Sequence, residues 1–342
     1  QVLRLDLIAA ILKKAGGPDW EFFLNIKDGV NLGVDQDLPR AEEIFEEKVK
    51  WKLEMVDGPG INEHANYASV EEHRKEVKAL FKEEESLGWM IEMSDEEAQK
   101  EYGGKLFVAA LGVVQEPGKI RVVHDGSNGV HVNNRIRLKD QARSPGAGEL
   151  RTILKQSAQK GSKLFVLAGD VSKAHRRIKV RREDWGFQAC RLEAGKVWLN
   201  CVGTYGMTPA GYFWARAAAG GIVRIAHYVM GPDGLSELLI YVDDFLLFAE
   251  SQKEVEAAGF LVFLWIVLGF PFRWKKFKGG TETDWIGYWM DVRNFKIGIS
   301  ERRALWLAGW LKSRIKEGVV DMADLEAVVG RLCFALGPLE FL

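Results

Sequence analysis

The sequence feature that most constrains the fold is a pair of adjacent acidic residues, Asp243 and Asp244, enclosed by apolar residues within 238–248. Short apolar runs rich in β-branched and aromatic residues, separated by a tight turn, predict a β-hairpin with the two carboxylates at its tip. Adjacent carboxylates in partly apolar surroundings repel each other and lose solvation, so they need a cation or a bound proton. Oxygen ligands on an open turn suit Mg²⁺. The alternative is an ordinary surface turn.

A third carboxylate follows another apolar segment. Residues 163–169 predict a strand, and Asp170 comes directly after it. An acidic residue delivered from a separate strand could face the hairpin tip and complete a metal site of the kind that uses two ions. The alternative for Asp170 alone is the N-cap of a following helix.

Length and composition allow a large folded protein. The chain has 342 residues, of which 47% are hydrophobic, so it can build a sizeable core and two or three lobes. Its three cysteines match no zinc motif, which favours a reducing intracellular compartment, nuclear or cytoplasmic. The longest apolar run, 259–272, is too short to span a bilayer. No charged-then-apolar signal segment opens the chain.

The distribution of charge points to a polyanionic partner. The net charge is −1, but residues 1–100 carry roughly −10 and residues 101–342 roughly +9, an asymmetry found in nucleic-acid binders. A basic run over 176–182 could contact template phosphates. Solvated helix faces are the alternative explanation for many of these charges.

The motif Tyr241-Val242-Asp243-Asp244 resembles the Tyr-x-Asp-Asp signature of reverse transcriptases, the RNA-directed DNA polymerases of retroviruses and retroelements. Residues 170–175 are similar to the first catalytic motif of that family, and 204–216 to the second. Five motifs occur in the family's order, and the resemblance covers residues 45–342. The chain resembles the gypsy-type and tyrosine-recombinase retrotransposons in particular.

The resemblance implies nucleotide-binding roles for several residues. Arg121 aligns with the arginine that holds the triphosphate of the incoming nucleotide, a role for which a guanidinium fork is well suited. Tyr205 is expected to pack on the nucleotide or the template. Lys275 or its neighbour Lys276 matches a lysine that assists pyrophosphate departure, and we assign Lys275. For Arg121, a surface arginine on a strand is the alternative.

His175 departs from the family pattern. Relatives carry Tyr or Phe there, packed under the sugar ring to exclude a 2′-hydroxyl. An imidazole is flat and could stack similarly, but it can also donate a hydrogen bond to that hydroxyl. Selectivity between deoxy- and ribonucleotides therefore stays open.

The segment 284–290 is similar to the hairpin that grips the primer 3′ end, which the resemblance assigns to Trp285, Ile286, Gly287 and Tyr288. Gly287 would allow the backbone to contact a phosphate. A plain buried strand is the alternative.

The resemblance implies an α+β right-hand polymerase with fingers, a palm with an antiparallel sheet packed on helices, and a helical thumb. We expect an N-terminal extension of unknown role at 1–44, fingers and the start of the palm at 45–160, the palm with an inserted fingers segment at 161–290, and thumb-like helices at 291–342, with no ribonuclease H domain. Helical spacing also predicts helices over 41–55, 70–87, 251–268, 300–315 and 321–336.

The function expected from these motifs is RNA-directed DNA polymerisation. Asp170, the backbone of Val171, Asp243 and Asp244 would hold two Mg²⁺ ions, which Mn²⁺ could replace. The expected partners are a primed RNA or DNA template and deoxynucleoside triphosphates, with no membrane, and further domains of a retroelement polyprotein are compatible. The alternative is a domesticated module that binds nucleic acid without polymerising, supported by His175 and the low net charge.

Overall fold

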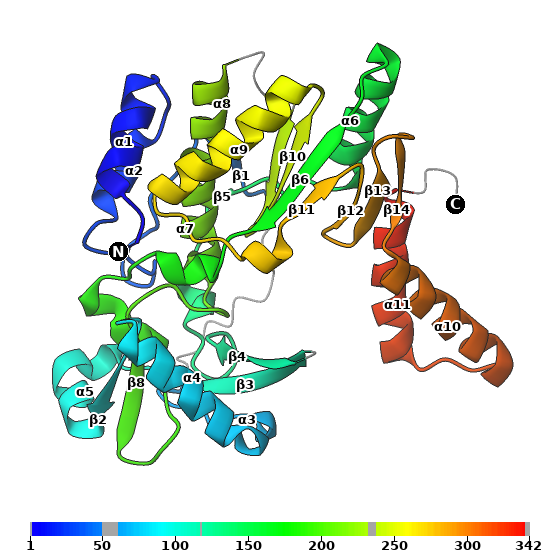
Figure 1. Cartoon of the computed structure of the whole chain (residues 1–342). Coiled ribbons are helices and arrows are strands. Elements are labelled where there is room, and N and C mark those ends of the chain that lie inside the picture. Colours follow the sequence, from blue (N-terminus) through cyan, green and yellow to red (C-terminus); the bar gives the residue numbers. More distant parts are fainter. Residues whose placement is uncertain (1, 50–60, 117, 232–236, 339–342) are drawn as a thin grey trace. The chain divides into compact units, whose positions relative to one another are not determined.

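The computed structural model describes residues 2–49, 61–116, 118–231 and 237–338. The chain forms two compact units, each built from two separate stretches (Figure 1). The first unit contains Gln1–Arg143 and Lys173–Arg224, and the second contains Ser144–Ser172 and Ile225–Leu342. No helix among the described residues combines the length and apolarity needed to cross a bilayer.

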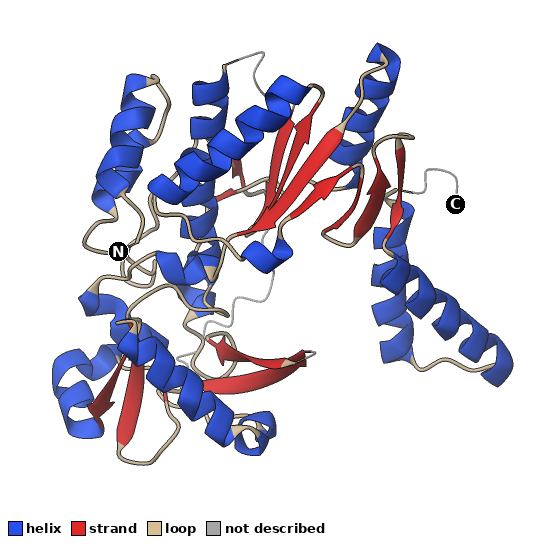
Figure 2. Cartoon of the chain, in the orientation of Figure 1, coloured by secondary structure: helices blue, strands red, loops and turns tan. Residues whose placement is uncertain are grey.

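The first unit contains a five-stranded sheet in the order β2-β8-β7-β3-β4. Figure 2 draws the strands in red and the helices in blue. Its strands are β2 (Met90–Ser94), β3 (Val108–Glu116), β4 (Lys119–Asp125), β7 (Ala189–Cys190) and β8 (Lys196–Asn200). Neighbours are antiparallel except β3 and β7, which run parallel. Strands β3 and β4 form a long antiparallel hairpin, and Arg121 lies on its second strand.

The helices of the first unit are α1 (Leu5–Lys14), α2 (Trp20–Asn25), α3 (Ala68–Glu72), α4 (Arg74–Ser86), α5 (Asp95–Tyr102), α7 (Thr208–Ala218) and the π-helix η5 (Ala219–Arg224). Helices α3, α4 and α5 pack on this sheet, and the other helices of the first unit pack elsewhere in it. Short 3₁₀ turns lie at η1 (Gly103–Lys105), η2 (Asn133–Arg135), η3 (Ala174–Arg177) and η4 (Arg182–Gln188).

The helix expected over 41–55 is wrong in its described part. Residues 46 and 47 instead form β1 (Glu46–Glu47), which pairs with β5 (Asp140–Gln141). The buried carboxylate of Asp140 accepts a hydrogen bond from the backbone N–H of Ala41 and pairs with Arg40. These long-range contacts outweigh the local helical pattern, because propensity alone is a weak force. The rest of the expected helix, 50–55, lies outside the described residues.

The first 44 residues belong to the core of the first unit. Ile8 and Leu12 of α1 and Phe23 of α2 are buried, and α1 packs on the π-helix η5. Gly220 of η5 permits this approach, since a Cβ there would lie 2.7 Å from the ring of Phe23. Residues 1–44, which carry no sequence motif, thus contribute to the hydrophobic core of the first unit.

The second unit is organised around a four-stranded sheet in the order β11-β6-β10-β9, with a three-stranded sheet β12-β13-β14. The strands are β6 (Phe165–Asp170), β9 (Glu237–Tyr241), β10 (Asp244–Ala249), β11 (Lys278–Gly280), β12 (Glu282–Trp285), β13 (Tyr288–Asp291) and β14 (Lys296–Ile299). The helices are α6 (Ala147–Lys160), α8 (Ile225–Met230), α9 (Gln252–Val267), the 3₁₀ turn η6 (Trp274–Lys276), α10 (Glu301–Glu317) and α11 (Met322–Leu336). The α+β class is confirmed, as are the helices expected near 251–268, 300–315 and 321–336.

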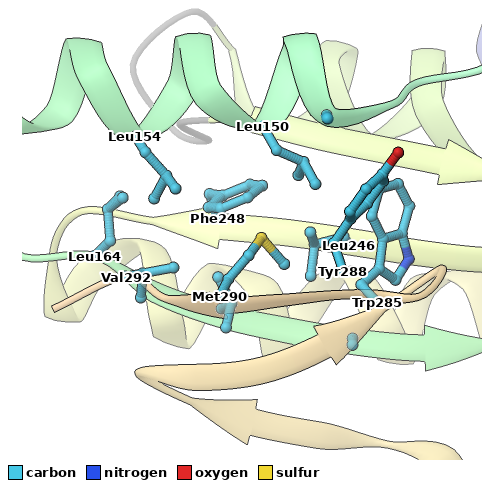
Figure 3. Packing of buried hydrophobic residues seen from close by; sticks show 12 residues of the cluster. Leu150, Leu154, Leu164, Leu246, Phe248, Trp285, Tyr288, Met290 and Val292 are labelled. Carbon is cyan, nitrogen blue, oxygen red and sulfur yellow. The ribbon is translucent and has the colours of Figure 1, made fainter. Parts of the chain in front are cut away.

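Alternating side chains of β10 build a core on each face of the four-stranded sheet. On one face Leu246 and Phe248 pack with Leu150 and Leu154 of α6, and Met290 of β13 closes the same cluster (Figure 3). On the other face the ring of Phe245 contacts Trp265 of α9 edge-on, at 5.3 Å between ring centroids. The strand that begins at Asp244 is therefore fixed from both sides.

We predict that Phe248→Ala lowers the free energy of unfolding by about 3–5 kcal/mol, because it removes a fully buried ring from a packed cluster. Phe263→Ala is the matched control, since Phe263 lies on α9 with 61% of its surface exposed and should change stability by less than about 0.5 kcal/mol. Urea unfolding followed by circular dichroism measures both. Equal losses would contradict the assignment of this cluster as the core.

Candidate active site

The antiparallel register of β6 and β10 brings the three predicted carboxylates together. Asp244, the first residue of β10, stands opposite Asp170, the last residue of β6. The backbone N–H of Val171 donates to the carbonyl oxygen of Asp243 at 2.8 Å, which extends the pairing past the strand ends. One carboxylate oxygen from each of Asp170, Asp243 and Asp244 lies within 4.8 Å of the others.

The hairpin tip carries backbone strain. Tyr241 pairs with Asp244, so Val242 and Asp243 form a two-residue loop. Val242 has a φ of 55°, a left-handed conformation that a β-branched residue rarely adopts. Such strain persists only where the surroundings impose it, and it concentrates at functional sites.

Two cationic side chains contact the buried carboxylate of Asp170. Lys276 forms an ion pair with Asp170 Oδ2 and lies 3.8 Å from Asp244 Oδ1. The Nε atom of Arg273 lies 3.2 Å from Asp170 Oδ1, and the backbone N–H of Arg273 donates to the carbonyl oxygen of Asp170 at 3.0 Å. The 3₁₀ turn η6 therefore supplies positive charge directly beside the acidic cluster.

This positive charge does not fully compensate the carboxylates. Burial raises the pKa of Asp243, and the charge of Asp170 raises it further. Burial and the charge of Asp243 raise the pKa of Asp244 to about 6, against the opposing effect of Lys276. Both shifts disfavour the ionised form, so the cluster has room for additional cationic charge.

The donor set fits a hard divalent cation. It consists of carboxylate oxygens from three residues, the ligands that Mg²⁺ and Mn²⁺ prefer. The buried Oδ1 of Asp170 has no hydrogen-bond donor among the described residues and faces only the ion-pair contact of Arg273.

The lysine beside the carboxylates is Lys276 and not the assigned Lys275. Both lie in η6, but the ion pair with Asp170 comes from Lys276, whereas Lys275 is an exposed residue in that turn. Sequence spacing could not separate the two neighbours. Arg273 lies three residues before Lys276, and nothing in the sequence singled it out.

Three predicted nucleotide contacts belong to the first unit. The His175 ring lies 5.0 Å from that of Tyr205, and burial lowers the pKa of His175, so the imidazole is neutral near pH 7. Neither ring nitrogen of His175 has a hydrogen-bond partner among the described residues. Arg121 is exposed on β4 and forms an ion pair with Glu116 at 2.7 Å. Their nucleotide roles stay predictions.

The predicted primer-grip residues form the turn between β12 and β13. Trp285 and Tyr288 pair across the hairpin and are buried in the core cluster, so their side chains serve packing. Ile286 and Gly287 form the loop with φ values of 45° and 94°. The φ of Gly287 favours glycine, and the flexible guanidinium end of Arg303 lies where a Cβ of residue 287 would be.

No family model and no curated protein matches the sequence. Solved structures match the fold. Three of them are foamy viral protease-reverse transcriptases. One, labelled dRH, is in complex with double-stranded DNA and matches at 14% identity with a TM-score of 0.61; another complex with double-stranded DNA matches at 13% identity with a TM-score of 0.56. The third is in complex with an RNA/DNA hybrid and matches at 14% identity with a TM-score of 0.55. The chain has a reverse-transcriptase-like fold. Each match covers 96% of this chain, which spans 52%, 62% and 40% of the respective relatives.

We predict that divalent ions stabilise the protein through the acidic cluster in a pH-dependent way. The pKa of Asp244 is about 6, above its ordinary 3.8, so a proton occupies the carboxyl below pH 6 and competes with a metal ion. Mg²⁺ or Mn²⁺ should therefore raise Tm more at about pH 8 than at about pH 5.

In the metal-free protein, the raised pKa of Asp244 also determines how stability changes with pH. Between the two pKa values the folded state binds more protons than the unfolded state, so ionisation of Asp244 costs stability as pH rises through this window. Asp244→Asn should remove that cost and weaken the metal response, while Asp324→Asn on exposed α11 should keep both. A metal-induced shift in Tm of unchanged size and pH dependence in Asp244→Asn would contradict this assignment.

Proposed function

We propose that this protein is an RNA-directed DNA polymerase that transfers nucleotides to a primer 3′-hydroxyl. The observation that carries the proposal is the convergence of Asp170, Asp243 and Asp244 at the ends of paired strands in a reverse-transcriptase-like fold. A nucleotidyl transferase needs a fixed set of anionic ligands for two divalent ions, and these three residues supply one.

Asp170 and Asp243, with the backbone of Val171, would hold two Mg²⁺ ions, Asp244 would assist, and Mn²⁺ could replace Mg²⁺. Ions held there would lower the pKa of the primer hydroxyl and stabilise the charge on the leaving pyrophosphate. The strand ends hold the ligands in place, so no reorganisation of the backbone is needed. Lys276 would move from Asp170 to the phosphates of the incoming nucleotide, because a compact ammonium binds phosphate as readily as carboxylate.

The remaining contacts follow from the chemistry of the first unit. Arg121 would release Glu116 and bind the triphosphate through its guanidinium fork. Tyr205 and His175, whose rings lie together, would support the base and the sugar of the nucleotide. On the second unit, the Gly287 loop would contact the primer backbone.

The proposed partners are a primed RNA or DNA template and deoxynucleoside triphosphates. The foamy viral relatives in complex with double-stranded DNA and with an RNA/DNA hybrid support this choice. A gypsy-type or tyrosine-recombinase retrotransposon origin, with further domains of a polyprotein as partners, is part of the same proposal.

A nucleic-acid-binding module without polymerase activity is the second candidate. The ion pairs of Asp170 with Lys276 and Arg273 favour it, because they partly neutralise the cluster from within the protein. Three crowded carboxylates oppose it, because they repel phosphates and would weaken a pure binder.

We predict that Asp243→Asn abolishes primer extension on a primed RNA template and leaves template binding within about twofold, because the change removes a metal ligand without altering shape. Asp324→Asn on exposed α11 is the matched control and should extend primers normally. Gel-based extension and fluorescence anisotropy measure the two properties. Normal synthesis by Asp243→Asn would refute the polymerase, and absence of synthesis by the unaltered protein with Mg²⁺ and Mn²⁺ would favour the binding module.

We also predict that His175→Phe sharpens the preference for deoxynucleotides by roughly 3- to 10-fold, the value of one hydrogen bond from the imidazole to a 2′-hydroxyl. The measurement is the ratio of kcat/KM for a deoxynucleoside triphosphate to that for the matching ribonucleoside triphosphate. Tyr205→Phe is the comparison, since it retains a ring beside His175 and should leave this ratio unchanged.

A further inference from the structure

The helices α10 and α11 of the second unit leave an apolar face uncovered. Helix α10 is described over its whole length, and none of its 17 residues is buried. Most of the stability of a helix in a protein comes from the packing of its apolar side, so a long helix with no buried residue lacks part of its contacts. Large exposed apolar surfaces mark interaction sites.

The contacts between α10 and α11 are made on one side of each helix. The guanidinium carbon of Arg303 lies 3.9 Å from the centre of the Phe334 ring, and that of Arg331 lies 3.7 Å from the centre of the Trp306 ring. The residue number thus rises along α10 as it falls along α11 across these contacts. The two helices therefore run antiparallel (Figure 1).

Each helix carries an apolar stripe away from these contacts. In α10 the stripe consists of Ala304, Ala308, Leu311 and Ile315. In α11 the stripe consists of Met322, Leu325, Val329, Leu332 and Leu336. Ala304 and Leu332 are half-buried and the other stripe residues are exposed, Ile315 by 82% and Met322 by 68%. Alternating intervals of three and four residues are the spacing of a seam between packed helices.

The two stripes lie on the same side of the helix pair. The contact side of α11 also contains its two buried residues, Val328 and Ala335. At about 100° per residue, each stripe lies roughly a third of a turn from the contact side of its helix, in the same rotational sense in both helices. Two antiparallel helices with this arrangement present their stripes on one side, so α10 and α11 share a continuous apolar face.

Opposite charges border this apolar face. Lys312 and Lys316 flank the stripe of α10 on the edge away from α11, and Glu326 flanks the stripe of α11 on the edge away from α10. All three side chains are exposed. Lys312 and Glu326 each lie roughly one turn of helix from the connection at 318–321, so they stand at the same height on opposite edges of the face.

We propose that a second copy of this chain covers the apolar face, with α10 of each copy lying antiparallel on α11 of the other. A two-fold axis parallel to the helices produces this arrangement, because it places the basic edge of one copy opposite the acidic edge of the other. Lys312 of each copy then meets Glu326 of the other, at the same height along the helices.

The sizes of the stripe residues suit the same arrangement. Near the connection, the large Leu311 and Ile315 fill the space between the two helices. At the other end, the small Ala304 and Ala308 leave room for the leucines of α11 in the second copy. A polyanion fits this face poorly, because the face is apolar and Glu326 repels phosphate groups.

Analytical ultracentrifugation tests the proposal, and the unaltered protein should show a reversible equilibrium of monomer and dimer between about 1 and 100 µM. The double variant Ile315→Lys with Val329→Lys should weaken dimerisation at least about a hundredfold, because it buries unpaired ammonium groups in the seam. Both positions are exposed within one chain, so the variant should fold.

The matched control is Phe260→Lys with Phe263→Lys, which adds the same charge at exposed apolar positions on α9 and should dimerise normally. An unaltered protein that is monomeric at the highest concentration would overturn the proposal and leave the face to a different partner. A dimer that the control disrupts as strongly as the stripe variant would overturn it as well.

Charge reversal tests how the two copies are arranged. Lys312→Glu alone and Glu326→Lys alone should each raise the dissociation constant of the dimer roughly 3- to 10-fold, because each change creates two like-charge contacts. The combination of both changes restores opposite charges and should return the constant to within about twofold of the unaltered protein. A combined variant weaker than either single variant would overturn the packing of α10 on α11.

The dimer is independent of the proposed activity. Asp243→Asn should dimerise as the unaltered protein does, because the apolar face contains none of the three carboxylates. A dimer that does not extend primers with Mg²⁺ or Mn²⁺ would refute the polymerase and support the interface, whereas primer extension by a strictly monomeric protein would support the polymerase and overturn the interface.

Discussion

The antiparallel pairing of β6 with β10 is the interaction on which the candidate active site depends. Asp170 ends one strand and Asp244 begins the other, so the backbone ladder itself sets the spacing of two carboxylates, and the tight hairpin adds Asp243 beside them. A one-residue slip in register would turn Asp244 to the opposite face of the sheet. The packed residues on both faces of β10 prevent that slip, because Phe245 and Phe248 fit different environments.

The hydrophobic core therefore has an electrostatic effect, because it holds the carboxylates of Asp243 and Asp244 close together. Burial raises the pKa values of Asp243 and Asp244, and the repulsion between carboxylates that a rigid sheet holds together raises them further. Gly169 contributes to this rigidity: a Cβ there would lie 2.5 Å from the ring of Phe245, so only glycine lets the neighbouring ring pack directly behind the cluster. The strained φ of Val242 is a further sign that the fold imposes the tip geometry.

The features that were predicted correctly are those that depend on local patterns of residues. Apolar runs that end in acidic residues gave the strands and the meeting of the three carboxylates, and helical periodicity gave α9, α10 and α11. Long-range contacts decided the rest. Buried Asp140 binds the backbone of Ala41, and the segment that follows forms a turn and a strand. Trp285 and Tyr288 pack in the core. The 3₁₀ turn η6 places Lys276, and not Lys275, beside Asp170. A periodicity or a spacing contains none of this information.

The balance of charge around Asp170 gives the strongest physical reason for a metal-dependent reaction. Arg273 and Lys276 bring two positive charges to three carboxylates, and burial together with the charge of Asp243 still raises the pKa of Asp244 to about 6. A structural ion-pair network would be stable with matched charges and would gain nothing from an extra acidic residue in a strained turn. A site that must accept divalent ions and polyphosphate needs that excess of carboxylate, together with cations mobile enough to exchange partners. The half-exposed side chain of Lys276 meets this second requirement, because it can leave Asp170 without disturbing the core.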